Sequence, residues 1–200
     1  MTEHLTAARL RGIPSLTGEP RSLALDDLPI DPAALFVGWL EDAIEAGVAE
    51  PHAATLATVD RDGMPDARTL ILKGLDERGW AVAGSRSSRK GEQLAVQPAA
   101  ALNFWWQPIM RAVRVRGLVA EASRADSEAD LAARSATARV GIDPDEWVLW
   151  RIHPVRAEFW QGALDRSHRR VVYTRTNIGW SIDRGDGQRE NADSRNGDEQ

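Results

Sequence analysis

Cationic side chains alternate along one short segment near the C-terminus, where Arg166, His168 and Arg170 are each two residues apart. In a β-strand, this period of two places all three side chains on the same face. Neighbouring positive charges repel one another unless an anion or an electron-rich ligand lies among them. The spacing therefore favours an anion-binding site, although a solvent-exposed face paired with carboxylates elsewhere would give the same pattern.

A second set of cations lies in the first half of the chain. Ser88, Arg89 and Lys90 stand at the expected start of a helix, where free backbone N–H groups and the helix dipole favour a phosphate group. Arg68 and Lys73 bracket the apolar segment RTLILK. Because they are five residues apart, they point to opposite faces of an ideal strand, and only a twist or a bulge would direct both at one ligand.

An aromatic residue precedes the C-terminal cations: Trp160, in the string EFWQG. An indole beside an anion site can stack on a planar ring, whereas an indole on a buried strand belongs to the core. The residue types alone are equally compatible with both roles, so Trp160 is a candidate ligand contact rather than an assigned one.

Several classes of catalytic site are excluded by missing residue types or spacings. The chain has no cysteine, which excludes disulfides, thiolate–zinc sites and cysteine nucleophiles. No pair among its four histidines has a metal-ligand spacing, and we expect no metal site. There is no G-x-S-x-G nucleophile elbow, and GSRSSRKG lacks the second glycine and the hydroxyl residue of a P-loop. The spaced arginine and lysine residues therefore remain as the candidates for a functional site.

The composition is that of a globular protein, with 42% hydrophobic and 28% charged residues among 200. No window approaches the ~20 apolar residues that a membrane span requires, so we expect no membrane association. The absence of cysteine and of a secretory signal favours a cytoplasmic location. The net charge of −5 argues against nucleic acid as a partner.

The distribution of apolar residues predicts one domain at residues 31–183. It follows an extended leader, residues 1–30, in which glycine and proline are too closely spaced for a long helix. After the domain, residues 184–200 have no apolar periodicity, and we expect a disordered tail.

Helical periodicity and capping residues predict helices at about residues 31–47, 88–96 and 125–138, with Asp31 capping the first and Ser87 or Ser88 the second. Strands are expected at about 53–59, 68–72, 80–83, 99–106, 111–121, 157–161, 170–174 and 179–182. The links DRDG and DERG are typical of hairpins, which disfavours parallel winding. We therefore expect an α+β, mainly β fold: a small antiparallel barrel or sandwich built from six to seven of these strands, with about three flanking helices.

These motifs together resemble the FMN-dependent pyridoxamine 5′-phosphate oxidases. EFWQG followed by R-x-H-x-R, with RTLILK and SRKG upstream, is a specific combination, and the similarity runs from about Asp27 to Trp180. The resemblance implies an antiparallel split β-barrel of the FMN-binding type. It also implies a homodimer with FMN in clefts at the subunit interface.

The resemblance assigns a role to each matching residue. FMN would be bound by Arg68, Leu70, Lys73, Arg89, Lys90, Trp160 and Arg170, with Arg89 and Lys90 on its phosphate. Arg166 and His168 would be the catalytic pair. The substrate would be held by Lys73, Arg134, Arg166 and His168.

The implied reaction removes two electrons from a CH–NH2 or CH–OH carbon of a small molecule, as a hydride passed to FMN. The product would be an aldehyde, formed by way of an imine for an amine, and O2 would reoxidise the flavin to give hydrogen peroxide. Because the flavin supplies the redox chemistry, the protein supplies orientation and charge. Arg166 would orient the substrate and stabilise developing negative charge, and His168 could hydrogen-bond the substrate ring.

The substrate region departs from the family pattern. The family stretch Y-F-x-x-R-P-x-x-S is DLAARSATA here, so Arg134 is kept while Asp130 and Ala138 replace the tyrosine and the serine. Each lost hydroxyl weakens phosphate binding by ~1 kcal/mol, and a nearby carboxylate would repel the phosphate. A glutamine expected in R-Q-V-R-V is Ala112, and an expected aromatic and hydroxyl pair is Ala83-Gly84.

Three functions therefore remain open. The first is a diverged oxidase of vitamin B6 metabolism acting on pyridoxamine or pyridoxine 5′-phosphate. The second is an FMN-dependent paralogue in secondary metabolism acting on another amine or a reduced ring. The third is a non-catalytic flavin-binding protein, against which the retention of Arg166 and His168 argues, because a carrier needs no substrate-binding pair.

Overall fold

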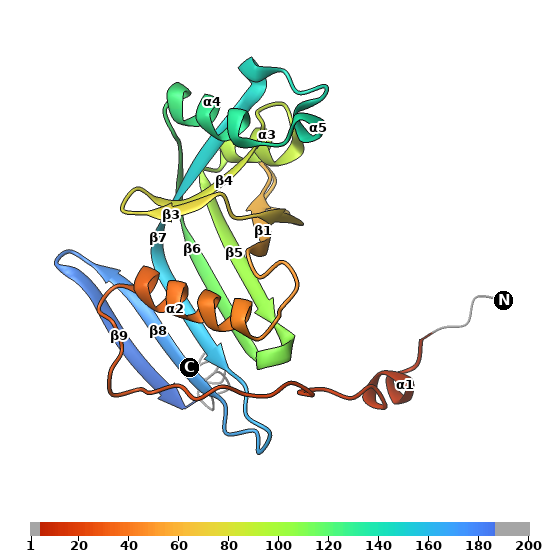
Figure 1. Ribbon diagram of the computed structural model, residues 1–200, viewed down its shortest axis with the longest axis vertical. Helices are drawn as coiled ribbons and strands as arrows, with labels where there is room; N and C mark the ends of the chain where they lie inside the picture. Colours follow the sequence, from red (N-terminus) through yellow and green to blue (C-terminus); the bar gives the residue numbers. More distant parts are fainter. Residues whose placement is uncertain (1–4, 187–200) are drawn as a thin grey trace, which may run out of the picture.

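The computed structural model describes residues 5–186, which form five α-helices and nine β-strands (Figure 1). The helices are α1 (Ala7–Arg11), α2 (Pro32–Glu45), α3 (Arg89–Val96), α4 (Arg124–Ala133) and α5 (Ala136–Arg139). The strands are β1 (Ala53–Val59), β2 (Pro65–Ile71), β3 (Gly74–Asp76), β4 (Gly79–Ser85), β5 (Ala99–Trp106), β6 (Arg111–Glu121), β7 (Trp147–Gln161), β8 (Arg169–Thr176) and β9 (Gly179–Asp186). In the described part of the chain, no helix has both the length and the apolar character needed to cross a membrane.

All nine strands join one curled antiparallel sheet, in the order β2-β1-β5-β6-β7-β4-β3, with β8 and β9 joined to β7 (Figure 1). On one side β7 pairs with β6 over residues 150–161. On its other side β7 pairs with β4 up to Ile152 and with β8 from Arg156 onward. The sheet therefore divides beside residues 153–155, and the expected α+β, mainly β split barrel is confirmed.

A close approach between β6 and β7 determines where the sheet bends. The register shifts between Arg116 and Gly117, and Gly117 lies opposite Pro154. A Cβ atom on Gly117 would lie 1.9 Å from the carbonyl oxygen of His153, so no larger residue fits unless the backbone moves. Pro154 has no N–H group to donate, which suits the point at which β7 passes from one partner strand to the next.

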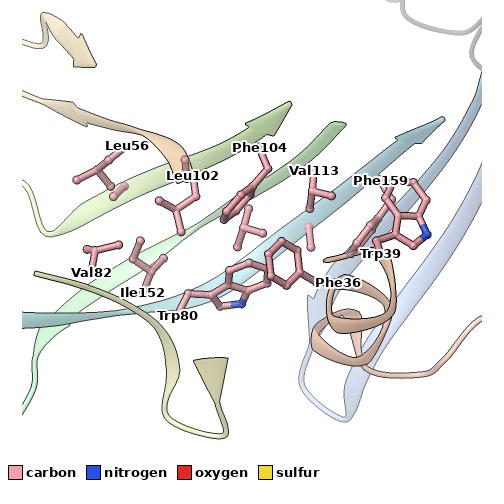
Figure 2. Packing of buried hydrophobic residues seen from close by; sticks show 14 of the residues in the cluster. Phe36, Trp39, Leu56, Trp80, Val82, Leu102, Phe104, Val113, Ile152 and Phe159 are labelled. Carbon is pink, nitrogen blue, oxygen red and sulfur yellow. The ribbon is translucent and has the colours of Figure 1, made fainter. Parts of the chain in front are cut away.

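Helix α2 covers the inner face of the sheet with aromatic side chains. Asp31 caps the helix, as expected, by accepting a hydrogen bond of 2.9 Å from the N–H of Ala33. The ring centroids of Phe36 and Trp80 are 4.4 Å apart, and those of Trp39 and Phe159 are 5.2 Å apart (Figure 2). Burial of each such side chain stabilises the fold by ~1.5–3 kcal/mol.

The leader is attached to the sheet through buried side chains. Arg111, 2% exposed, donates hydrogen bonds to Asp42 at 2.6 Å, to Gln161 at 2.7 Å and to the carbonyl of Ser22 at 3.3 Å. Its guanidinium also stacks over Trp39, 4.2 Å from the ring centroid. One guanidinium thus joins the leader, α2, β6 and β7.

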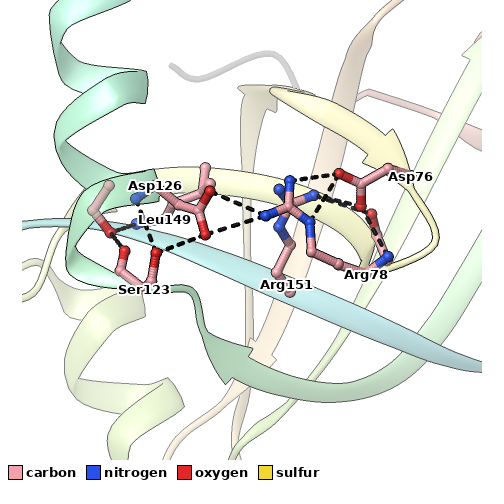
Figure 3. A network of polar contacts seen from close by, with 8 residues as sticks. Asp76, Arg78, Ser123, Asp126, Leu149 and Arg151 are labelled. Carbon is pink, nitrogen blue, oxygen red and sulfur yellow. Dashed lines mark hydrogen bonds and ion pairs between the residues drawn. The ribbon is translucent and has the colours of Figure 1, made fainter.

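An ion-pair network ties the turn between β3 and β4 to helix α4 (Figure 3). Arg78 contacts Asp76 at 2.8 Å and Asp126 at 3.1 Å, and Arg151 of β7 contacts Asp76 at 3.0 Å. Ser123 donates to Asp126 at 2.8 Å and caps α4. The network fixes the start of α4 against the sheet.

The observed elements differ from the expected ones at a few boundaries. The helix expected at 125–138 is two helices, because Arg134 has extended dihedral angles and Ser135 caps α5. Strand β3 and the short helix α1 were not expected, and the strand count is nine rather than six or seven. Strand β9 includes residues 184–186, which were assigned to the tail. The rest of the expected tail, residues 187–200, lies outside the described residues.

We expect Gly117→Ala to lower the free energy of unfolding by about 3 kcal/mol, because the added methyl group overlaps backbone atoms of β7. Gly185→Ala is the matched control, since it is also a strand glycine but has open space where the added methyl group would lie, and it should change stability by less than about 0.5 kcal/mol. Urea unfolding of both variants measures the difference. Equal stability of the two variants would contradict the proposed bend constraint.

Candidate functional site

Arg68 on β2 is held by three polar side chains that the sequence did not single out. It forms an ion pair of 3.0 Å with Asp66, donates to the side-chain oxygen of Gln93 at 3.1 Å, and donates to the hydroxyl of Thr58. Thr58 and Gln93 are buried. The available signal for Asp66 was its position two residues before Arg68, which places both on one strand face. The available signal for Gln93 was its position three residues after Lys90, which places both on one face of a helix.

The start of α3 brings Arg89 and Lys90 to the same place. Ser88 caps the helix by accepting a hydrogen bond of 3.4 Å from the N–H of Gly91, which confirms the expected cap. Arg89 is exposed and pairs with Asp66 at 2.8 Å. Lys90 donates to the Ser88 hydroxyl at 3.2 Å. The structure therefore brings Arg68 and Arg89 together on the Asp66 carboxylate, with Lys90 next to Arg89 at the start of α3.

The ammonium group of Lys90 lies in a confined position over β4. A Cβ atom on Gly84 would lie 2.3 Å from the Lys90 Nζ, so the glycine found where the family has a hydroxyl residue leaves room for this side chain. Burial lowers the pKa of Lys90, and the positive charge of Arg68 lowers it further. An anion at this point would offset both effects.

These residues fit the phosphate group of FMN. Arg68 and Arg89 pair with the carboxylate of Asp66, and Lys90 follows Arg89 at the N-terminus of the helix, where backbone N–H groups favour an anion. The carboxylate of Glu146 accepts a hydrogen bond of 3.0 Å from the N–H of Ser87 in the same loop. Within residues 5–186, Lys90 forms no ion pair. Arg68, Arg89 and Lys90 therefore carry more positive charge than the carboxylates of Asp66 and Glu146 neutralise, which is the condition a phosphate-binding site requires.

Trp160, His168 and Arg170 form a second group at the far end of β7. Trp160 lies opposite Arg170 across β7 and β8, and its ring centroid is 4.8 Å from that of His168. The Nδ1 atom of His168 accepts a hydrogen bond of 3.1 Å from the N–H of Ala163. In the neutral imidazole the proton therefore resides on Nε2, which can donate to a ligand.

Arg166 lies in the loop that precedes β8. The expectation that Arg166, His168 and Arg170 share one strand face was wrong, because β8 begins only at Arg169. Arg166 has a φ of +65°, in the left-handed region that few non-glycine residues adopt, and it is exposed. Arg166 and His168 line a cavity of about 840 Å³ whose opposite wall is leader residues 23–26.

A buried carboxylate, Glu158, organises the arginines beside Trp160. It pairs with Arg114 at 2.6 Å, Arg156 at 2.9 Å and Arg170 at 3.7 Å, and its side chain is 5% exposed. Burial raises the pKa of Glu158, but the hydrogen bond from Arg114 and the three positive charges outweigh burial and hold the pKa below its ordinary value. Glu158 therefore remains charged and fixes the arginine side chains.

The contacts of the remaining expected site residues are with other parts of the protein. Lys73 is exposed after β2, where its N–H donates to the carbonyl of Ala81 at 2.8 Å, and Leu70 packs against the core. Arg134 stacks over Trp147, 4.7 Å from the ring centroid, and donates to the carbonyl of Ala138 at 3.2 Å.

Asp130, like Arg134, contacts other residues of the protein. It accepts a hydrogen bond of 2.9 Å from the indole N–H of Trp147. The acidic substitution thus has a partner within the fold, so it is not simply a negative charge facing a ligand. Within this chain, Asp130, Trp147 and Arg134 form one internal cluster beside the ends of α4.

The two groups of functional side chains lie at opposite ends of one chain. In Figure 1, α3 lies near one end of the molecule, whereas the loop between β7 and β8 lies near the other. The structure therefore unites Arg68 with Arg89 and Lys90, and Trp160 with His168 and Arg170, but it does not unite the two groups within a single chain.

We expect Glu158→Gln to lower the free energy of unfolding at pH 7 by about 2 kcal/mol, because three arginines lose their shared counter-charge and two of them are partly screened by water. The pKa of Glu158 is lower in the folded state than in the unfolded state. The stabilisation is therefore fully present above the unfolded-state pKa of about 4.3 and is lost as the pH falls through the folded-state pKa.

Urea unfolding of wild type and Glu158→Gln between pH 7 and pH 3 should therefore show converging stabilities in acid. Glu128→Gln is the control, because Glu128 is an exposed carboxylate paired with Arg124, and its effect should stay below about 0.5 kcal/mol. A difference between wild type and Glu158→Gln that stays constant down to pH 3 would refute the assigned role of the Glu158 charge.

Comparison with known proteins places this arrangement in a family. A family model described as "Pyridoxamine 5'-phosphate oxidase" matches residues 40–161, and one described as "Pyridoxine 5'-phosphate oxidase C-terminal dimerisation region" matches residues 147–184. The chain is 34% identical to a pyridoxine/pyridoxamine 5′-phosphate oxidase of Cyanothece sp., with 86% of this chain and 97% of that protein covered. It is 36% identical to the Bordetella petrii oxidase of the same name, with coverages of 83% and 94%.

Solved structures agree with the sequence comparisons. PhzG from Burkholderia lata 383, solved in complex with tetrahydrophenazine-1-carboxylic acid, superposes with a TM-score of 0.78 at 25% identity, covering 84% of this chain and all of that one. A pyridoxamine 5′-phosphate oxidase-related, FMN-binding protein from Nostoc punctiforme shares the fold, with a TM-score of 0.66 at 20% identity and coverages of 78% and 97%. Because one family model spans more than half of the chain and the relatives align over nearly their whole length, this chain belongs to the pyridoxamine 5′-phosphate oxidase family.

Proposed function

We propose that the chain is an FMN-dependent oxidase that acts as a homodimer on a small molecule carrying a CH–NH2 or CH–OH carbon, with O2 as the electron acceptor. The observation that carries this proposal is the cluster of Arg68, Arg89 and Lys90 at the start of α3, in which Asp66 pairs with the two arginines. Family membership and the fit of this cluster to a phosphate group both support FMN as the cofactor.

A homodimer would complete the site that each chain holds in two parts. The groups around α3 and around Trp160 are separated within one chain, and a second copy can bring one group of each chain beside the other group of its partner. The match of residues 147–184 to a dimerisation region supports this arrangement, because that segment includes Trp160 and Arg170. We infer two equivalent sites per dimer, as two-fold symmetry requires.

The chain's own residues would bind and orient the substrate. Bound FMN would supply a two-electron acceptor for the hydride of the substrate carbon, and O2 would take up these electrons to give hydrogen peroxide. An alcohol would give the aldehyde directly, and an amine would give an imine that water hydrolyses to the aldehyde and ammonia. Arg166, exposed in the cavity wall, would orient the substrate and stabilise developing negative charge. The Nε2–H group of His168 would donate to the substrate, because the Ala163 N–H fixes the orientation of the imidazole.

Two substrate classes are in question within this function. The first is pyridoxamine or pyridoxine 5′-phosphate, as the names of the curated relatives suggest. The second is a different amine or reduced ring. The position of Arg134 favours the second class. To bind a substrate phosphate, its guanidinium would have to leave the Trp147 ring and the Ala138 carbonyl. A non-catalytic flavin carrier is the weaker alternative, since Arg166 and His168 line an open cavity.

The double substitution Arg89→Ala/Lys90→Ala should raise the Kd for FMN at least 100-fold, because two charge-assisted contacts to phosphate are lost, each worth about 1.5–3 kcal/mol. Arg86→Ala is the matched control, since Arg86 is an exposed arginine just before α3 that pairs with Glu121. Quenching of FMN fluorescence measures binding. Full flavin occupancy in the double variant would overturn the phosphate assignment.

The reaction is tested by the visible spectrum of the purified protein under anaerobic conditions. Addition of a donor should bleach the flavin bands, and admission of O2 should restore them with release of hydrogen peroxide. Pyridoxine 5′-phosphate tests the first substrate class, and a reduced polycyclic amine tests the second. Arg166→Ala should keep its flavin but undergo reduction at least tenfold more slowly, because the substrate loses its orienting charge. A bound flavin that no donor of either class bleaches would favour the carrier.

A further inference from the structure

A row of side chains crosses the outer face of the sheet beside the candidate site. Trp105 of β5 lies opposite Ala112 of β6, and Ala112 lies opposite Trp160 of β7. Residues directly opposite one another in antiparallel strands project from the same face. The adjacent residues Phe104 and Val113 are buried in the core, so the row lies on the other face of the sheet.

The aromatic rings of this row make a continuous surface. The ring centroids of Trp105 and Trp160 are 6.0 Å apart, and those of Trp160 and His168 are 4.8 Å apart. The two indoles meet over the methyl group of Ala112, where a long side chain would separate them. Trp105 remains 48% exposed, so part of this surface faces solvent within the chain.

We propose that Trp105 is a specificity-determining residue that binds a planar substrate of more than one ring, together with His168 and with Trp160, which would contact both the flavin and the substrate. This inference rests on the proposed function, because it places the substrate at the end of β7 where Trp160 and His168 lie. A single pyridine ring covers only part of a surface built from three consecutive rings. Stacking on Trp105 therefore strengthens the binding of a fused-ring molecule and adds little to the binding of a one-ring molecule.

The charges around the row indicate a carboxylate as the substituent of this substrate. Arg166 is exposed beside His168, and its planar guanidinium matches a carboxylate in two parallel hydrogen bonds. Arg134, the cation that the family resemblance assigns to a substrate phosphate, is engaged with Trp147. The site thus combines an extended aromatic surface with the exposed guanidinium of Arg166, which suits a fused-ring carboxylate better than a phosphorylated pyridine.

The inference is tested by titrating two probes into the FMN-loaded protein: phenazine-1-carboxylate, with three fused rings, and pyridoxal 5′-phosphate, with one. Calorimetry gives each Kd. Trp105→Ala should raise the Kd of phenazine-1-carboxylate about tenfold, as expected for loss of an aromatic stack, and change that of pyridoxal 5′-phosphate less than about twofold. Trp105→Phe should retain most of the wild-type affinity for phenazine-1-carboxylate. Trp180→Phe, a substitution at a tryptophan that packs on Tyr173 and Arg175, should leave both values unchanged.

Three results would overturn the inference. Trp105→Ala could raise the Kd of both probes equally, or of neither, which would show that Trp105 does not discriminate by ring number. The variant could lose its flavin, which would make Trp105 a cofactor contact. Light scattering could show that the variant is monomeric, which would mean that Trp105 packs against the second copy. Failure of the proposed function has a different signature: a wild-type protein that binds no FMN, or whose bound flavin no donor reduces.

Discussion

The contact of Gly117 with the backbone at His153 and Pro154 is the constraint on which the arrangement of the site depends. It bends the sheet where β7 leaves β4 and joins β8. Before the bend, β7 carries Trp150, whose ring centroid is 6.0 Å from the ammonium group of Lys90. After the bend, the same strand carries Trp160 beside His168. One strand therefore supports both groups of functional side chains, and the bend sets their separation.

Each group uses the same electrostatic arrangement. Asp66 fixes Arg68 and Arg89, and Glu158 fixes Arg114, Arg156 and Arg170. In both places one carboxylate holds several arginines in defined positions without neutralising all of them. A carboxylate for each cation would leave no attraction for an anionic ligand, whereas no carboxylate at all would leave the arginines mutually repelled and mobile. The shared carboxylate orders the cations and preserves an excess of positive charge for the ligand.

The sequence predicted those features that depend on local interactions. The hairpin turns at 60–63 and 76–79, the caps at Asp31 and Ser88, and the strands at 53–59, 99–106 and 111–121 were all confirmed. It missed Thr58 and Gln93 because they meet only when α3 packs against β1. It misplaced Arg166 and His168 because a spacing of two residues does not distinguish a strand from a loop. The separation of the two groups depends on the bend at Gly117, whose close contact no local pattern reveals.

The structure also explains how the substrate region can diverge without loss of the fold. In the family pattern the position of Asp130 is a tyrosine, and that of Ala138 is a serine. In this chain Asp130 accepts from the Trp147 indole, and Arg134 stacks on the same ring while capping the Ala138 carbonyl. These side chains therefore make contacts within the protein, and their polar groups are satisfied without a ligand. In the cluster around α3, by contrast, Lys90 forms no ion pair within residues 5–186, so positive charge is left for an anion. Under the proposed function, the chain would keep the cofactor-binding residues that the family resemblance assigns, and its substrate contacts would lie on the aromatic surface at the other end of β7.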